Sequence, residues 1–593
     1  MSVELEYQRW MGNENLDAKL RVQLEAMTDK EKEDAFYKSL EFGTAGMRGV
    51  IGPGTNRMNI YTIRKANVGF AKYLLENVEN AKERGVAIAY DSRNFSLEFA
   101  VESARVLATH GIKAYVFAGA RPTPELSFAV GYLGCAGGIV ITASHNPPEY
   151  NGYKIYDESG CQTLPAEGDK VICGVNAVDD VFAIPVRLES ELRDDGLIET
   201  IGHEIDIEYL ASVASLEING DVDKSALRIV FSPLHGTAGA LTQQLMADCG
   251  YTQFHVVAEQ RFPDGNFPTV NYPNPEDAAA FEYAIKKGHE IDADILFTTD
   301  PDADRMGVAV KGFGGKYELQ TCPFNLSAFP VFKSDGEYVL LTGNQIGAVL
   351  VYYILSSRKA IGTLPAKGRM FDTIVSSELA GAIARSHGIE TISTLTGFKF
   401  IGEQIRLMEG TEYEYVFGYE ESYGSLIGDF VRDKDAIQAV LILSEAAAYY
   451  KSQKKTLCDI LEDIYAEYGF YQEDLVNITL AGKEGGEKIQ LLLSEFRATP
   501  PTEIAGLKVV TTLDYKTGER VTEDSISKID LPSANVLKYI LEDGSWFVLR
   551  PSGTEPKAKI YISVVTDDKI TTLERIAAIK EEVLAKVNAT LSR

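Results

Sequence analysis

Three aspartates at alternate positions stand out chemically in the segment Asp300-Pro301-Asp302-Ala303-Asp304-Arg305. Carboxylates spaced in this way along a loop can converge on one hard cation, and Mg²⁺ prefers oxygen ligands and often shares a phosphate oxygen. An EF-hand would require Gly and Glu where this chain has Arg305 and Lys311. The alternative is a solvated acidic turn, but an apolar run precedes the loop and would fix its position. The spacing therefore predicts a metal site at Asp300, Asp302 and Asp304.

A serine in the segment Thr142-Ala143-Ser144-His145-Asn146-Pro147 is a candidate nucleophile. His145 is a possible activating base, although adjacent side chains usually diverge. No G-x-S-x-G turn surrounds the serine, which disfavours an acyl-transfer hydrolase. The alternative is an ordinary turn before prolines. Beside a Mg²⁺ loop, however, the metal would neutralise a phosphoryl group on Ser144, so the serine is interpreted as a phosphoryl carrier.

Two further segments are suited to a phosphorylated, hydroxyl-rich ligand. The segment from Arg550 to Lys557, R-P-S-G-T-E-P-K, combines hydroxyls, backbone N–H groups, Arg and Lys, the donors of a phosphate-binding loop. Its alternative is a plain hairpin turn. The segment from Gly418 to Gly424, G-Y-E-E-S-Y-G, offers carboxylates and a serine that can accept hydrogen bonds from sugar hydroxyls. Its alternative is a helix N-terminus with acidic residues in the first turn.

The overall charge limits the classes of ligand. The chain has 58 Lys and Arg residues against 86 Asp and Glu, a net charge of −28. This excess disfavours nucleic acids and anionic membranes as partners and requires that any anion site be a local basic pocket. Two predicted basic loops, residues 43–49 and 151–154, contribute to that pocket. The candidate cations are Arg48, Lys154, Arg305, Lys399, Arg550 and Lys557.

Alternating apolar runs and helical segments predict α/β units that position these residues. Helices are expected between residues 6 and 40, and the last ~120 residues are expected to form an α+β domain that ends in a helix. Each predicted functional segment follows a strand, where open α/β sheets place their ligand-binding loops. The predicted strands span residues 86–90, 113–117, 138–142, 228–231, 294–298, 338–342, 415–417, 546–549 and 559–565. The predicted domains are residues 1–205, 206–325, 326–460 and 461–593.

The composition also indicates a compartment. No run of ~18 apolar residues predicts a transmembrane helix, and the acidic N-terminus lacks the apolar core of a signal peptide. Six scattered cysteines without a C-x-x-C pair argue against a disulfide framework or a zinc site. We therefore expect a cytoplasmic protein that works as a monomer or homodimer.

Taken in order, these segments resemble the α-D-phosphohexomutase superfamily across nearly the whole chain. The T-A-S-H-N-P, D-P-D-A-D-R and R-P-S-G-T-E-P segments carry the resemblance, and the chain looks most similar to the phosphoglucomutase-2/phosphopentomutase-like subgroup. The resemblance implies three related α/β domains with mixed sheets and a smaller C-terminal α+β domain around a central cleft. It also implies a phosphoglucomutase that interconverts α-D-glucose 1-phosphate and glucose 6-phosphate, with Mg²⁺ as cofactor and glucose 1,6-bisphosphate as activator and intermediate.

The resemblance further implies roles for individual residues. Ser144 would be phosphorylated, and a phosphate oxygen on it would join the three aspartates around Mg²⁺. Arg48 and Arg305, from the predicted basic pocket, are also predicted to be catalytic residues. Residues implied to bind the sugar phosphate are Thr396, Gly397, Lys399, Glu420, Ser422, Arg550, Ser552, Gly553, Thr554 and Lys557. Some members carry a histidine shortly after the sugar-binding Glu and Ser, where this chain has Tyr423-Gly424, so Lys154 and His145 both remain candidates for the acid/base. A phosphopentomutase and a non-catalytic sugar-phosphate binder are the alternatives.

Overall fold

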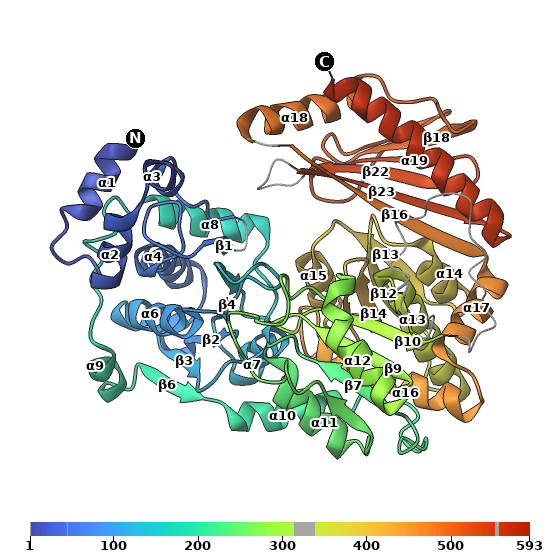
Figure 1. Ribbon diagram of the computed structural model, residues 1–593, viewed down its shortest axis with the longest axis horizontal. Helices are drawn as coiled ribbons and strands as arrows, with labels where there is room; N and C mark the ends of the chain where they lie inside the picture. Colours follow the sequence, from blue (N-terminus) through green and yellow to red (C-terminus); the bar gives the residue numbers. More distant parts are fainter. Residues whose placement is uncertain (1, 44–45, 313–337, 481, 552–556, 593) are drawn as a thin grey trace. The chain divides into compact units, whose positions relative to one another are not determined.

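The computed structural model describes residues 2–43, 46–312, 338–480, 482–551 and 557–592 (Figure 1). The described residues form two compact units. The first contains residues up to 312 together with 338–346 and 398–457, and the second contains residues 347–397 and 458–592. Among the described residues, none of the helices combines the length and apolarity needed to cross a membrane.

Short helices precede the first sheet: α1 (Val3–Met11), α2 (Ala18–Ala26) and α3 (Asp29–Phe36). α2 begins where the Asp17 carboxylate accepts two backbone N–H groups of the first turn, which helix geometry leaves without partners. Trp10 and Phe36 pack edge to face, with 5.8 Å between their ring centroids. The prediction of helices between residues 6 and 40 is confirmed.

The first sheet is mixed, with the strand order β1-β5-β4-β2-β3-β6. β4, β2, β3 and β6 run parallel, and β5 pairs antiparallel with both β4 and β1. All residues of β2 and β4 are buried, as in a strand covered on both faces. The strands are β1 (Gly46–Val50), β2 (Val86–Tyr90), β3 (Ala114–Phe117), β4 (Gly137–Ile141), β5 (Tyr150–Tyr156) and β6 (Ile198–Ile201). The helices are α4 (Ile60–Asn77), α5 (Ala81–Arg84), α6 (Ser96–Thr109), α7 (Thr123–Leu133), α8 (Pro165–Asn176), α9 (Glu189–Asp194) and α10 (His203–Ala214).

The two segments predicted as basic loops lie mostly in strands, residues 46–49 in β1 and residues 151–154 in β5; residues 44 and 45 lie outside the described residues. Arg48 lies on β1 and Lys154 on β5, and these strands pair antiparallel with Arg48 opposite Gly152. The loop prediction was wrong because the glycines mark close approach of two backbones rather than a turn. A Cβ on Gly152 would lie 2.4 Å from the carbonyl oxygen of Thr142.

The second sheet is also mixed, with the order β11-β10-β9-β7-β8. β8, β7 and β9 run parallel, whereas β10 pairs antiparallel with β9 and β11. Residues 300–305 therefore connect an antiparallel pair of buried strands, as the strand-end prediction requires. The strands are β7 (Ile229–Ser232), β8 (Phe254–Val256), β9 (Ile295–Thr299), β10 (Met306–Lys311) and β11 (Tyr338–Leu341). The helices are α11 (Ala238–Asp248), the 3₁₀ helix η1 (Ala278–Phe281) and α12 (Glu282–Ile291).

The next region begins with α13 (Gly343–Ala360). In the second unit, β12 (Gly368–Thr373) and β13 (Glu390–Thr394) pair in parallel, with α14 (Glu378–Ser386) between them in sequence. In the first unit, α15 (Phe398–Met408) leads to β14 (Glu414–Glu420), which pairs antiparallel with β15 (Gly424–Leu426) and is followed by α16 (Ala436–Ser452). The predicted sugar-binding segment 418–424 is thus a tight β-hairpin rather than a loop after a short strand, and β14 extends to Glu420.

The C-terminal region is built on an antiparallel sheet with the order β16-β23-β22-β21-β18-β19-β20. Apolar residues of this sheet and of the final helix share one core, so the predicted α+β domain and closing helix are confirmed. The helices are α17 (Leu457–Tyr468), α18 (Gly482–Ala498) and α19 (Lys569–Leu591). The strands are β16 (Phe470–Thr479), β17 (Glu503–Ile504), β18 (Leu507–Asp514), β19 (Glu519–Thr522), β20 (Ile526–Lys528), β21 (Leu537–Leu541), β22 (Trp546–Pro551) and β23 (Lys557–Thr566).

Candidate active site

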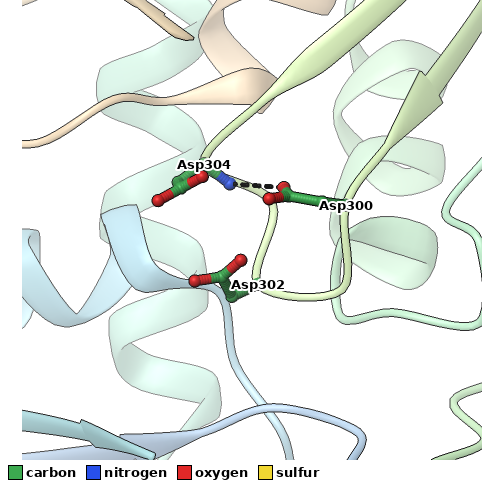
Figure 2. Close-up of side chains that lie close together, drawn as sticks. All are labelled: Asp300, Asp302 and Asp304. Carbon is green, nitrogen blue, oxygen red and sulfur yellow. Dashed lines mark hydrogen bonds between the residues drawn. The ribbon is translucent and has the colours of Figure 1, made fainter. Parts of the chain in front are cut away.

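The loop between β9 and β10 brings three carboxylates together. One oxygen from each of Asp300, Asp302 and Asp304 lies within 4.8 Å of the other two, and all three side chains are buried. Figure 2 shows them on a single loop, with the backbone N–H of Asp304 donating to Asp300. Asp300 Oδ1 also accepts the N–H of Arg305 at 3.0 Å. Ala303 completes the turn in a left-handed conformation, φ +53°.

This cluster has the donors that a hard cation requires. Asp302 Oδ1 and Asp304 Oδ1 are buried and make no hydrogen bond within the described part of the chain. Buried polar atoms normally have partners, so two neighbouring orphaned oxygens favour a cation as their ligand. Burial, and then the negative charges of Asp304 and Asp302, raise the pKa of Asp300 well above its ordinary value. A divalent cation would relieve this repulsion, and the all-oxygen donor set fits Mg²⁺.

Two lysines reach the cluster from other elements. Lys154 Nζ lies 2.9 Å from Asp302 Oδ2 and 3.6 Å from Asp304 Oδ2. Lys434 Nζ, just before α16, lies 3.2 Å from Asp304 Oδ2 and 2.9 Å from Asp433 Oδ1. Burial alone would lower the pKa of each lysine, but the carboxylates outweigh it and raise both pKa values. Both side chains therefore keep their positive charge at neutral pH and partly balance the aspartates.

Ser144 follows β4 and contacts the same cluster. Its Oγ donates to Asp300 Oδ2 at 2.7 Å, and the residue is buried. Its φ of +50° places it in the left-handed region, which is uncommon for a residue other than glycine. Its N–H donates to Thr142 Oγ1 at 2.8 Å. The structure thus joins the two segments that were predicted to act together.

His145 lies closer to Ser144 than expected. The two side chains were predicted to diverge, yet His145 Nδ1 lies 3.1 Å from Ser144 Oγ. That expectation was wrong because it assumed an extended backbone, whereas Ser144 is left-handed. The same Nδ1 lies 3.3 Å from Arg305 Nη1, an obligate donor, and accepts its hydrogen bond. Burial, followed by the charges of Arg305 and Arg48, lowers the pKa of His145 well below its ordinary value, so the imidazole is neutral.

Two arginines border the serine loop. Arg305 Nη1 donates to Glu276 Oε1 at 3.0 Å, and Arg48 Nη1 donates to Asn146 Oδ1 at 2.8 Å. Arg48 is exposed, whereas Arg305 is only partly accessible. Together with Lys154, they supply the local positive charge that the acidic chain was predicted to need beside Ser144.

The predicted sugar-binding residues divide between the units. In the first unit, Glu420 is the last residue of β14 and is buried. Its carboxylate is one of those that raise the pKa of Lys434 against the effect of burial. Ser422 lies in the hairpin that follows, and Lys399 lies in the first turn of α15, where burial lowers its pKa. Glu420 is thus a predicted sugar ligand that lies close to Lys434, which contacts Asp304.

Other predicted ligands belong to the second unit. Thr396 and Gly397 follow β13. Arg550 on β22 donates to the Tyr561 hydroxyl at 3.4 Å, and Lys557 at the start of β23 is exposed. The roles of these residues stay predictions, and Ser552, Gly553 and Thr554 lie outside the described residues.

Four family models match consecutive parts of the chain. Their descriptions are phosphoglucomutase/phosphomannomutase alpha/beta/alpha domain I (residues 39–180), domain II (207–315), domain III (342–468) and the C-terminal domain (475–580). The chain belongs to the phosphoglucomutase/phosphomannomutase family. The predicted four-domain α/β architecture is therefore confirmed.

Family members of similar length share much of this sequence. A phosphoglucomutase of Staphylococcus epidermidis is 39% identical over 543 residues, 91% of this chain and 93% of that protein. One of Staphylococcus aureus is 37% identical over 571 residues, 96% and 97% of the two chains. Solved structures share the fold: a Burkholderia thailandensis family protein (TM-score 0.63, 20% identity, 93% and 97% covered) and Paramecium pp63/parafusin (0.64, 17%, 94% and 97%).

Sequence reasoning missed two residues that contact the aspartate loop, residues 300–304. Lys434 resembles a solvated charge in the run R-D-K-D, and its only signal is the position of that run before a buried helix. Thr123, the first residue of α7, donates its hydroxyl to Asp302 Oδ2 at 3.0 Å and its N–H to the Asp302 carbonyl at 2.9 Å. The strand-end rule would have drawn attention to it, because the loop before α7 follows β3 at the same sheet edge as Ser144.

Proposed function

We propose that this protein is a phosphoglucomutase that interconverts α-D-glucose 1-phosphate and glucose 6-phosphate. The contact between Ser144 Oγ and Asp300 at 2.7 Å carries the proposal, because it places a potential phosphoryl carrier against a set of metal ligands. The Staphylococcus proteins named phosphoglucomutase, at 37–39% identity over most of the chain, support the choice of substrate.

In the proposed reaction, the free sugar hydroxyl attacks the phosphorus of phospho-Ser144. The bond between phosphorus and Ser144 Oγ breaks, the serine oxygen takes up a proton as the sugar hydroxyl loses one, and glucose 1,6-bisphosphate forms. This intermediate turns around, and its other phosphate returns to Ser144 by the reverse step. Asp300, Asp302 and Asp304 would hold Mg²⁺ with a phosphate oxygen on Ser144, and the ion would neutralise phosphoryl charge during transfer.

The protonation states assign different roles to the two acid/base candidates. Lys154 keeps its proton, because the aspartates raise its pKa, so it suits charge stabilisation rather than proton transfer. His145 is neutral and its Nδ1 lies 3.1 Å from Ser144 Oγ, so it would accept a proton there once Arg305, which donates to the same Nδ1, is displaced. Arg48 and Arg305 would stabilise negative charge on the transferred phosphoryl group.

The remaining substrate contacts follow from the family pattern and are part of the proposal. Lys399, Glu420 and Ser422 would bind sugar hydroxyls, together with Thr396 and Gly397. Arg550, Ser552, Gly553, Thr554 and Lys557 would bind the phosphate that is not being transferred. The five described cysteines are free thiols, which agrees with the reducing cytoplasm we propose as the compartment.

The test compares glucose 1-phosphate with ribose 1-phosphate as substrates, each with and without Mg²⁺. We expect a glucose preference and dependence on Mg²⁺; a ribose preference of about tenfold, or 1.4 kcal/mol, would instead indicate a phosphopentomutase.

Intact mass should reveal one phosphoryl group after incubation with glucose 1,6-bisphosphate. Ser144→Ala should abolish both turnover and labelling, whereas Ser225→Ala, an exposed serine, should change neither. Absence of labelling in the wild type would favour a non-catalytic binder.

A further inference from the structure

A buried arginine outside the predicted site holds the Ser144 loop. Arg93 follows β2, and its side chain is fully inaccessible. Its Nη1 donates to the carbonyl oxygens of Pro147, at 2.8 Å, and Tyr150, at 3.1 Å. Its Nη2 donates to the carbonyl oxygens of Ser144 and Asn146. All four acceptors belong to the seven residues 144–150, so one guanidinium is hydrogen-bonded along the length of this loop.

The charge of Arg93 is paired with the carboxylate of Asp91. Asp91, also inaccessible, has Oδ2 at 3.4 Å from Arg93 Nε, and its Oδ1 accepts the backbone N–H of Arg93 at 2.9 Å. The guanidinium also lies 4.9 Å from the ring centroid of Phe267. A buried charge is costly unless it is paired and hydrogen-bonded. Asp91 meets the first requirement, and the four loop carbonyls meet the second.

The loop requires such a cation because of its own conformation. Ser144 is left-handed, and four carbonyl oxygens from residues 144–150 converge on one point. Oxygens arranged in this way repel one another unless a donor lies between them. This conformation is also the one in which Ser144 Oγ lies 2.7 Å from Asp300. The hydrogen bonds from Arg93 to the loop and the position of the Ser144 side chain therefore depend on the same backbone conformation.

We propose that Arg93 is a positioning residue for phosphoryl transfer, whose guanidinium holds residues 144–150 in the conformation that directs Ser144 Oγ to the aspartate loop. The inference rests on the proposed function and assigns Arg93 no contact with substrate. A lysine would keep the charge opposite Asp91, but its ammonium is a point donor and cannot reproduce the planar fork that reaches four carbonyls.

The first test is Arg93→Lys. We expect kcat to fall about 100-fold, the effect of a displacement near 1 Å at a reacting group. KM for glucose 1-phosphate should change less than about threefold, because the contacts of Arg93 within the described residues are with the serine loop, Asp91 and Phe267. Amide hydrogen exchange should accelerate in residues 144–150 and remain unchanged in β2 and α6. Arg84→Lys is the matched control, because Arg84 donates to the carbonyls of Gly134 and Cys135, away from Ser144, at 2.9 and 2.8 Å.

A second variant keeps the inference testable where Arg93→Lys fails to fold. Asp91→Asn with Arg93→Met removes both buried charges and still lacks the fork, so kcat should again fall about 100-fold at nearly constant KM. Wild-type kcat in a folded form of either variant would overturn the inference, as would slow turnover with unchanged hydrogen exchange in residues 144–150. Failure of the wild type to become phosphorylated at Ser144 would instead refute the proposed function.

Discussion

Two clusters of charged side chains, one in each unit, contain similar groups in different arrangements, and in the second of them Glu378 is exposed. In the metal-loop cluster, formed by Asp300, Asp302 and Asp304 with Lys154 and Lys434, the lysine nitrogens lie 2.9 and 3.2 Å from carboxylate oxygens. In the second-unit cluster, formed by Asp372, Glu378 and Lys538, Lys538 Nζ donates instead to the Ile374 carbonyl at 2.9 Å and lies 3.9 Å from Glu378.

This difference in contact decides which groups stay charged. Burial lowers the pKa of Lys538 and raises that of Asp372 to about 7, so both groups shift toward neutrality. In the metal-loop cluster, the lysines keep their charge because carboxylates touch them. Buried charges survive where the fold brings opposite charges into contact, and that condition is met beside Ser144.

The largest expected effect is found by replacing one aspartate with asparagine in each cluster and comparing the two single variants. Asp302→Asn removes an anionic ligand, so we expect kcat to fall by at least about 100-fold at fixed Mg²⁺ and the Mg²⁺ concentration for half-maximal activity to rise. Asp372→Asn should leave kcat within about twofold, because Asp372 lies in the other cluster. Steady-state kinetics across a Mg²⁺ titration measure both. An unchanged Mg²⁺ requirement in Asp302→Asn would contradict the metal assignment.

The lysines provide the next comparison. Lys434→Met removes one of the two lysine cations beside Asp304, so kcat should fall about tenfold as that carboxylate loses its fixed partner. The concentration of Mg²⁺ for half-maximal activity should fall as well, because less positive charge opposes the ion. Lys538→Met should alter neither value. Parallel loss of kcat and Mg²⁺ affinity in Lys434→Met would indicate general disruption of the site instead.

The sequence was most informative where chemistry and strand ends coincide. Asp300–Asp304 and Ser144 each follow a buried apolar strand, and the rule that such ends carry functional loops placed them together before their contact was known. The pattern could not reveal Lys434, because a lysine in a charged run looks the same whether it is solvated or buried. Only the tertiary fold brings α16 to the β9–β10 loop.

Backbone conformation accounts for the other errors. The contact between Ser144 and His145 depends on a left-handed residue that no periodic pattern signals. Gly46 and Gly152 resembled turn residues, yet they lie in paired strands where a Cβ would collide with backbone. In the first case the decisive feature is the backbone conformation of one residue, and in the second it is the close approach of segments distant in sequence. Local propensity carries no record of either.

The pH dependence of the free energy of unfolding tests the raised pKa of Asp372 in the second-unit cluster. The folded pKa of Asp372 is about 7, above the value near 3.9 in an unfolded chain. Between these values the folded state binds more protons, so the contribution of Asp372 to stability is complete below about pH 4 and is lost as pH rises toward 7. Asp372→Asn lacks this loss. Its stability relative to wild type should improve by on the order of 2 kcal/mol between pH 5 and pH 8. Denaturant titrations of both proteins measure this, and a constant difference would contradict the raised pKa.

The smallest expected effect is that of Lys538→Met. The variant loses the hydrogen bond to Ile374 and the contact of the ammonium with Trp546, 4.1 Å from the ring centroid, but no longer buries a charge. The lost contacts destabilise the fold and the removal of a buried charge stabilises it, so the free energy of unfolding should change by less than about 1 kcal/mol at pH 7. Because Lys538 lowers the pKa of Asp372 against the effect of burial, its removal should shift the pH-dependent loss of stability to higher pH. An unshifted pH profile would show that the two groups do not interact, and a shift to lower pH would contradict the direction of the effect.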